Sequence, residues 1–469
     1  MDTGGPTQAA VVMAGQTVPS HAAPAALRHV PSLVERFTNT PDASKLVFVM
    51  VGLPARGKSF ISMQLSRFLN WTGLETRVFN AGDHRRKTEL GVQDASYFDP
   101  KSAAATARRD AIALEVLERM IAWLSEGQDR VAVFDATNTT RTRRCMVAEK
   151  LRASPGTGVI FVESTCNDAA VVEANLALKL SKSPDYASMP REEALQDLLR
   201  RISHYEKVFE PMDEEQMTLS GEVICVSYIK LLNFSSHVVA HNIWGRAATT
   251  VLPYLMALHV GSRPVWLVRL PHSDVTAHAW RMQGKQWPPP PEVQFAEQPL
   301  SLQGRAFVEA VAAYLDPVAQ QAASIAVFSS THQRGLELAE RLGGGRARTS
   351  LNPQDRGACY GFDTAEVAEH APDVWADPLH KRFAGGESLA DMLRRLAPTL
   401  IEIEQEMRPV LVVAPLSCLQ VLYCYYAGLP VASALTVKVP MHTVVELQPN
   451  GACFTERRLS MQDLCDSTS

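Results

Sequence analysis

The chain has 469 residues, of which 46% are hydrophobic and 20% charged, and its formal net charge is −4. This length exceeds one ordinary hydrophobic core, so we expect two domains, and the small negative charge argues against a nucleic-acid partner. No apolar stretch is long enough to span a membrane. The eight cysteines form no CxxC pair, which favours a reducing compartment over a disulfide framework or a zinc site. We therefore expect a cytoplasmic protein without a membrane partner.

Residues 1–43 precede the first regular pattern and are rich in Ala, Gly, Pro and Ser. They lack the basic start and the sustained apolar run of a secretory signal, and they carry too few arginines for a transit peptide. Their composition predicts a disordered tail.

Apolar runs alternate with helical patterns in residues 44–262, the first predicted domain. The runs LVFVMV, TRVFN, VAVFDAT and VIFVEST are typical of strands buried on both faces. The segments AATARRDAIALEVLERMIAWL and REEALQDLLRRISHYEKVF have apolar residues at three-to-four spacing, which predicts helices. The alternation indicates an α/β fold with a parallel sheet covered on both faces. A further helix, TTVLPYLMALHV, lies in the connecting segment that follows.

Residues 263–469 repeat this alternation and predict a second α/β domain. Its elements are PVWLVRL, IAVFSS, the helix GESLADMLRRLAPTLIEIEQEM, VLVVAP and ALTVKV. The tetraproline at 288–291 is interpreted as a stiff surface loop.

The octet GLPARGKS at residues 52–59 satisfies the P-loop pattern between a predicted strand and a predicted helix. A chance glycine-rich turn is the alternative, but the complete motif in the right context disfavours it. Its backbone N–H groups and the helix N-terminus suit an anion, Lys58 can bridge the β- and γ-phosphates, and Ser59 can bind Mg²⁺. The predicted ATP-binding residues of the loop are Gly52, Leu53, Pro54, Ala55, Arg56, Gly57, Lys58 and Ser59.

Asp135 ends the apolar run of RVAVFDATNTT, where a P-loop enzyme needs a carboxylate for its metal. Capping of a helix is the alternative role for an Asp at this position. Together with the P-loop, Asp135 indicates that ATP is used with Mg²⁺.

Arginines concentrate near the predicted strand ends and helix starts, where open α/β sheets bind ligands. Taken singly, most such arginines are simply solvated. As a group they match a second phosphate bidentately, so we expect a phosphorylated small molecule as acceptor. They are Arg85, Arg86, Arg109, Arg143 and Arg201.

The first domain resembles the kinase half of the 6-phosphofructo-2-kinase/fructose-2,6-bisphosphatase family over about residues 45–262. The resemblance rests on GLPARGKS, FNAGDHRR, ASYFDP, VAVFDATNTTRTRR, FVESTCND, SPDY, HYEKVFEPMDEE and SYIK. It implies transfer of the ATP γ-phosphoryl group to the C2 hydroxyl of fructose 6-phosphate, and hence a role in regulating glycolysis.

The resemblance also implies roles for single residues. Asn175 falls on the ATP-binding segment. The family's lysine after it is displaced by one place, so Lys179 is the first candidate and Lys182 the second. His84 replaces the family's Tyr before the arginine pair. Cys166 matches a cysteine near the active site, although a small buried apolar residue is an equal interpretation. The sugar phosphate would contact Arg85, Arg86, Arg109, Thr137, Arg143, Arg201 and Tyr205, and the catalytic residues would be Lys58, Asp135, Lys179 and Cys166.

The second domain resembles the family's phosphatase half, a histidine-phosphatase (phosphoglycerate mutase-like) fold. The framework FAGGESLADMLRRLAPTLIEIE, VLVV and KVPMHTVVEL is kept. Such an enzyme uses a His nucleophile in an Arg-His-Gly motif. This chain keeps Arg269 but has Leu270 at the His position and Pro271 at the Gly position.

Two further reactive groups of the resemblance are missing. Pro415 stands where the second His is expected, and Pro353 replaces the acid carboxylate. Arg334 and His442 still match, so weak anion binding is expected without hydrolysis. His272 is two places past the lost nucleophile, on the same strand face but roughly 7 Å away, which makes replacement of the nucleophile unfavourable.

Three alternatives stay open. The enzyme remains bifunctional through His272 or Asp274; both halves bind metabolites without catalysis; or the P-loop domain phosphorylates another small molecule. For the altered domain, homodimerisation, stabilisation of the kinase and allosteric sensing are the hypotheses.

Overall fold

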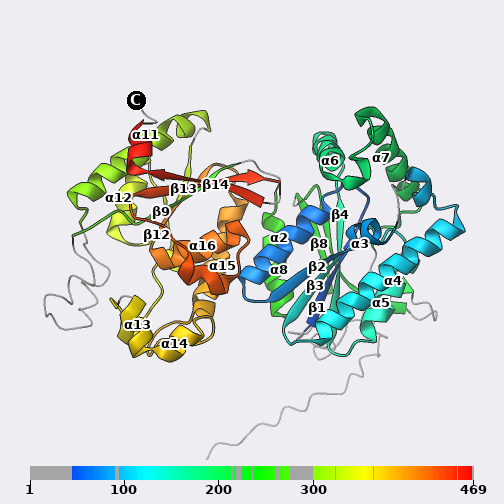
Figure 1. The fold of residues 1–469 in the computed structure, drawn as a ribbon, viewed down its shortest axis with the longest axis horizontal. Coiled ribbons are helices and arrows are strands. Elements are labelled where there is room, and N and C mark those ends of the chain that lie inside the picture. The colour runs from blue at the N-terminus through cyan, green and yellow to red at the C-terminus, as the bar shows by residue number, and fades with distance from the viewer. Residues whose placement is uncertain are drawn as a thin grey trace, which may run out of the picture.

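The computed structural model describes residues 45–89, 94–212, 215–217, 223–234, 236–259, 263–274, 299–322, 324–362, 364–451 and 453–466. Two α/β bodies lie side by side, coloured blue to green and green to red along the chain (Figure 1). The predicted tail and the tetraproline loop lie outside the described residues. Within the described part of the chain, every helix is too short or too polar to cross a membrane.

The first body is built on a six-stranded sheet of order β2-β3-β1-β4-β7-β8. The first five strands in this order pair in parallel, as predicted, and β8 adds an antiparallel edge. Strand β1 is buried along nearly its whole length because helices cover both faces. The strands are β1 (Lys45–Val51), β2 (Glu75–Asn80), β3 (Arg130–Asp135), β4 (Thr157–Thr165), β7 (Ser227–Leu232) and β8 (His237–His241), with a separate hairpin β5 (Glu215–Met217) and β6 (Val223–Cys225).

Side-chain caps fix where several helices of this body begin. Asn80, Ser102, Thr140 and Asp168 each accept a hydrogen bond from a backbone N–H in the first turn of the helix that follows. The helices are α2 (Lys58–Trp71), α3 (Ala81–Thr88), η2 (Ala95–Phe98), α4 (Ala103–Ser125), α5 (Arg141–Arg152), α6 (Ala169–Lys182), η3 (Pro184–Tyr186), α7 (Arg191–Glu206) and α8 (Gly245–Ala257).

The second body has a six-stranded sheet of order β11-β10-β12-β9-β13-β14, parallel from β11 to β9 and antiparallel thereafter. Its strands are β9 (Val265–Arg269), β10 (Ala326–Ser329), β11 (Arg346–Ala347), β12 (Val410–Ala414), β13 (Thr443–Asn450) and β14 (Cys453–Ser460). Its helices are α11 (Leu302–Gln321), α12 (Gln333–Arg341), η4 (Thr349–Leu351), η5 (Gly357–Cys359), α13 (Thr364–His370), α14 (Pro372–Ala376), α15 (Leu389–Gln405), α16 (Leu416–Ala427), η6 (Val431–Thr436) and α17 (Met461–Asp466).

The prediction of a strand at ALTVKV is wrong. The segment begins inside η6 and continues as an irregular stretch, and the strand comes afterwards, as β13. Pro430 and Pro440 bracket this run, and proline cannot donate a hydrogen bond to a sheet ladder. Ala434 and Val439 are buried, so the apolar residues of this segment pack against the core without forming a strand.

The two bodies share one hydrophobic cluster, in which α2 and α8 pack on α15 and α16. The Trp71 indole Nε1 donates to the Val421 carbonyl at 2.8 Å, and the hydroxyls of Tyr254 and Tyr425 are 2.9 Å apart. The rings of Phe68 and Tyr254 stack with centroids 4.0 Å apart. The helix that follows the P-loop is therefore packed directly against the second body.

Candidate active site

The P-loop glycines occupy positions that other residues cannot take. Gly52 has φ 137°, and a Cβ there would lie 2.4 Å from the Ser164 carbonyl oxygen. Gly57 has φ 83° at the N-cap of α2, and a Cβ would lie 2.8 Å from the Phe234 ring. Both values lie in the region that favours glycine. The loop therefore closes tightly over the end of β1 and leads directly into α2.

Lys58, Ser59 and Asp135 converge at the carboxyl edge of the first sheet. The Ser59 hydroxyl donates to Asp135 Oδ2 at 2.7 Å, and Lys58 Nζ donates to the Leu53 carbonyl at 2.7 Å. A hydroxyl and a carboxylate side by side are the hard oxygen ligands that suit Mg²⁺. The residues present therefore fit a bound magnesium ion.

Asn80 is a site residue that the sequence reasoning missed. Its Nδ2 donates to Asp135 Oδ2 at 2.5 Å, and the β2–β3 register places the two residues opposite each other. Asn80 ends the run TRVFN as Asp135 ends VAVFD, and the carboxyl ends of neighbouring parallel strands meet at one edge. That shared position was the available signal.

Two lysines at the site are buried strongly enough to lose much of their basicity. Burial lowers the pKa of Lys58 from 10.5 to about 7, although the Asp135 charge opposes this. Burial, together with the Arg201 charge, lowers the pKa of Lys179 to about 8. Burial raises the pKa of Asp135, against the hydrogen bond from Ser59 and the charge of Lys58. An incoming polyphosphate would supply the negative charge that favours both ammonium forms.

We therefore expect ATP binding to take up protons above pH 7. At pH 8 the empty site holds Lys58 mostly neutral and Lys179 about half neutral, because their pKa values are about 7 and about 8. The phosphates raise both pKa values, so between about one and two protons should enter per site. At pH 6 both lysines are already charged and contribute nothing. Calorimetry of a non-hydrolysable ATP analogue in buffers of different ionisation enthalpy measures the uptake. Equal uptake by Lys58→Met and wild type at pH 8 would contradict this.

The predicted acceptor residues line one cavity of about 340 Å³ next to this edge. Burial of two of them is nearly complete, with Arg85 5% and Arg201 9% exposed. Lys58, Ser59 and Asp135 also line it, so the cavity opens directly onto the phosphate-binding groups. The predicted residues brought together here are Arg85, Arg86, Arg109, Thr137, Arg143, Lys179, Arg201 and Tyr205.

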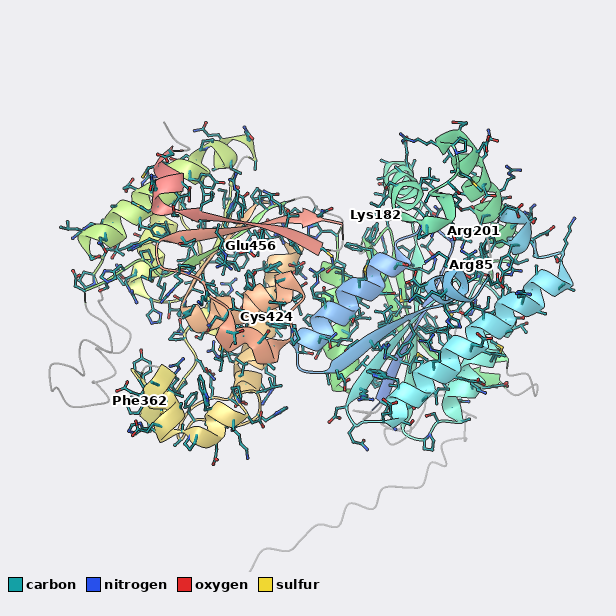
Figure 2. All side chains as sticks on the ribbon, viewed as in Figure 1. Arg85, Lys182, Arg201, Phe362, Cys424 and Glu456 are labelled. Atoms are coloured by element: carbon teal, nitrogen blue, oxygen red, sulfur yellow. The ribbon has the colours of Figure 1, made fainter. Side chains whose placement is uncertain are left out.

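A second cavity of about 710 Å³ adjoins the first, with which it shares Lys58, Ser59 and Asp135 in its lining. Asn175 lines it and has a buried side-chain Nδ2 without a hydrogen-bond partner in the described residues. Lys179 and Lys182 both line it, but only Lys179 also lines the acceptor cavity. Gly451, at the tip of the β13–β14 hairpin, completes the wall from the second body. Figure 2 shows Lys182 facing that hairpin.

Several predicted residues are not brought to the cavities. Cys166 is 1% exposed just after β4 and lines neither cavity, so its catalytic role stays a prediction. Gly52, Leu53 and Arg56 also lie outside both linings, so their contact with ATP stays a prediction. His84 lines the second cavity, here named the nucleotide-side cavity after the predicted ATP-binding residue Asn175. There the His84 ring contacts Glu115 and Arg119 at 2.9 and 3.0 Å.

The substituted positions of the second body do converge at the carboxyl edge of its sheet. The Leu270 N–H donates to the Ala414 carbonyl at 3.2 Å, which puts Leu270 beside Pro415. Pro353 lies near the start of α16, because the Gln354 N–H donates to Ser417 Oγ at 3.1 Å. Side chains without acid, base or nucleophile thus stand together where the resemblance requires reactive groups.

Cationic and imidazole groups remain around these positions. Burial lowers the pKa of Arg269 and of Arg334, and Arg334 Nη1 donates to the Pro271 carbonyl at 2.8 Å. His442 lies with its ring centroid 6.1 Å from that of His272. The His272 Nδ1 is 2.8 Å from Ser301 Oγ, so this ring atom is already engaged by a neighbouring helix cap.

Comparison with known families matches both bodies. A family model described as 6-phosphofructo-2-kinase matches residues 35–262, and one described as histidine phosphatase superfamily (branch 1) matches residues 293–462. These matches define a P-loop kinase domain joined to a histidine-phosphatase fold. A solved structure from Mycobacterium tuberculosis, an open reading frame product, covers 42% of this chain and 95% of its own, with TM-score 0.33 and 20% identity.

Curated relatives match most of the length of this chain. Human 6-phosphofructo-2-kinase/fructose-2,6-bisphosphatase 1 is 33% identical over 423 residues, which cover 89% of this chain and 84% of the relative. The Caenorhabditis elegans enzyme of the same description is 32% identical and covers 86% of each chain. The Arabidopsis thaliana enzyme is 30% identical, covering 92% of this chain and 56% of its own. The chain belongs to the 6-phosphofructo-2-kinase/fructose-2,6-bisphosphatase family.

Proposed function

We propose that this protein transfers the γ-phosphoryl group of ATP to the C2 hydroxyl of fructose 6-phosphate, giving fructose 2,6-bisphosphate. The observation that carries the proposal is the pair of adjoining cavities. Both are lined by Lys58, Ser59 and Asp135, one leads to Asn175, and the other is ringed by arginines. ATP bound on one side would present its terminal phosphate to an anionic acceptor on the other.

The position of each side chain indicates its role in the proposed reaction. Lys58 and Lys179 are shared between the cavities and would neutralise charge that develops on the transferring group. Ser59 and Asp135 would hold Mg²⁺, which supplies charge neutralisation at the β- and γ-phosphates. The arginines would hold the acceptor's 6-phosphate and so aim its C2 hydroxyl. A loose phosphoryl-transfer transition state needs positioning and charge neutralisation more than a strong base.

Product identification tests the kinase proposal. Purified protein with ATP, Mg²⁺ and a panel of phosphorylated and unphosphorylated sugars should give one main product, fructose 2,6-bisphosphate. A different main product would show that the acceptor is not fructose 6-phosphate. If no acceptor gave a product, a non-catalytic regulator would be favoured.

We further propose that the second domain does not hydrolyse fructose 2,6-bisphosphate. Leu270, Pro353 and Pro415 supply neither nucleophile nor proton donor. On one preparation, synthesis should be measurable while phosphate release from fructose 2,6-bisphosphate stays at the level of an enzyme-free blank. The Asp135→Asn variant removes synthesis and isolates the breakdown reaction. Release above blank in that variant, abolished by His272→Ala, would instead support a bifunctional enzyme.

A further inference from the structure

A buried carboxylate stands behind the arginines of the acceptor cavity. Asp185, in η3 between α6 and α7, is 6% exposed. Its Oδ2 accepts from Arg85 Nη2 at 2.5 Å and lies 3.4 Å from Arg201 Nη1 and 3.5 Å from Arg86 Nη1. The three arginines line the cavity but Asp185 does not. Figure 2 shows Arg85 and Arg201 close together although they come from different helices.

An aromatic ring fixes the same two guanidinium groups from another direction. The Arg201 Cζ atom lies 3.7 Å from the centroid of the Phe98 ring, and the Arg85 Cζ atom lies 5.2 Å from it. Stacking on a ring and pairing with a carboxylate restrain a planar guanidinium at its face and at its edge. Few other rotamers remain for these side chains once both restraints act.

The restrained arginines still have unused donors. Arg85 Nη1 and Arg201 Nε are buried and lack a hydrogen-bond partner within the described residues. Buried donors of this kind are rare in proteins and call for a ligand or ordered water. Although burial opposes it, the charges of Arg85 and Arg201 lower the pKa of Asp185, which keeps the carboxylate ionised near neutral pH.

We propose that Asp185 is a positioning residue for the acceptor: it holds Arg85 and Arg201 in the orientation that binds the acceptor's phosphate, without touching the acceptor itself. This rests on the proposed function. One carboxylate neutralises only one of the three guanidinium charges. The cavity therefore stays positively charged and can still bind an anion, while the carboxylate fixes the orientation of the arginines.

The test is the kinetics of Asp185→Asn in the full-length protein. The amide keeps the shape of the carboxylate but loses the charge that pairs the arginines, so the KM for fructose 6-phosphate should rise about tenfold or more. The KM for ATP should stay within about twofold, because Arg85 and Arg201, which Asp185 holds, line the acceptor cavity but not the second cavity. A general structural defect would raise both values together. Asp185→Glu keeps the charge one methylene away and should give an intermediate KM.

Glu446→Gln is the matched control. Glu446 on β13 is also buried, at 8% exposed, and it also pairs with an arginine, Arg457, at 3.5 Å, but it lines neither cavity. Its KM values should stay near wild type. Unchanged acceptor KM in Asp185→Asn, or in Asp185→Glu if the amide variant fails to fold, would overturn the proposal. If wild type prefers another phosphorylated acceptor, the proposed function fails, and the Asp185 comparison is decided on that acceptor.

Discussion

Replacement of Lys58 by methionine should lower kcat for fructose 2,6-bisphosphate formation by at least about a hundredfold. Lys58 lines both cavities, so in the proposed reaction its charge would lie where the terminal phosphate passes from donor to acceptor. Methionine has a similar length and fills the buried space, but it cannot neutralise the transferring group. Steady-state kinetics with product identification measures the loss.

The same substitution should not weaken the fold. Burial lowers the pKa of Lys58 in the folded protein from 10.5 to about 7. The unfolded chain therefore binds this proton more tightly, so Lys58 lowers the free energy of unfolding as the pH falls below 10.5, and the full cost is reached below about pH 7. An apolar side chain removes that cost, at the loss of one hydrogen bond to the Leu53 carbonyl. The unfolding temperature should therefore stay level or rise, as expected where activity is favoured over stability.

A surface lysine supplies the control for this experiment. Lys150 pairs with Glu118 at 2.9 Å on the outside of the first body, and Lys150→Met should leave kcat unchanged. Retention of more than a tenth of the wild-type kcat in Lys58→Met would contradict the role assigned to this residue. A large fall in its unfolding temperature would show that the lysine supports the fold instead.

The convergence of Lys58, Ser59 and Asp135 at one sheet edge could be predicted because its signals are local. The P-loop is one contiguous motif with its own strand and helix, and Asp135 is marked by the end of an apolar run. The same rule of strand ends also explains why Leu270 and Pro415 meet. It would have found Asn80 if applied to every strand. Each of these positions depends on a short stretch of chain and on parallel pairing.

Other features depend on contacts between distant segments and left no local pattern. Asp185 is 100 residues from Arg85 in the chain, and only the packing of η3 against α3 and α7 brings them together. Gly451 reaches the nucleotide-side cavity from the second body. The strand expected at ALTVKV failed for a related reason, since a short apolar run can pack on a core without joining a sheet.

The largest expected loss of stability lies between the two bodies. Trp71→Ala should lower the free energy of unfolding by about 4 kcal/mol, as is usual for removing a large buried aromatic side chain. Trp71 is 1% exposed, its indole donates to the Val421 carbonyl, and its ring lies 6.0 Å from that of Tyr425. Chemical denaturation followed by circular dichroism, with activity measured alongside, gives both the loss and its effect on the kinase.

Trp375→Ala is the control, because this tryptophan on α14 is 45% exposed and its loss should cost little. Trp71→Phe keeps most of the ring but removes the hydrogen bond, and should cost about 1–2 kcal/mol.

The position of Trp71 at the end of α2 links this loss to catalysis. The same helix begins at Lys58 and Ser59, so a helix freed from α16 would also release the groups that we propose to hold phosphate and metal. We therefore expect Trp71→Ala to lose kinase activity at a lower temperature than wild type, with both bodies unfolding in one transition. Two separate transitions, with the kinase unaffected, would show that the second body is not needed to hold α2. A single transition would give the second body a physical role in this protein, as the surface on which the P-loop helix packs.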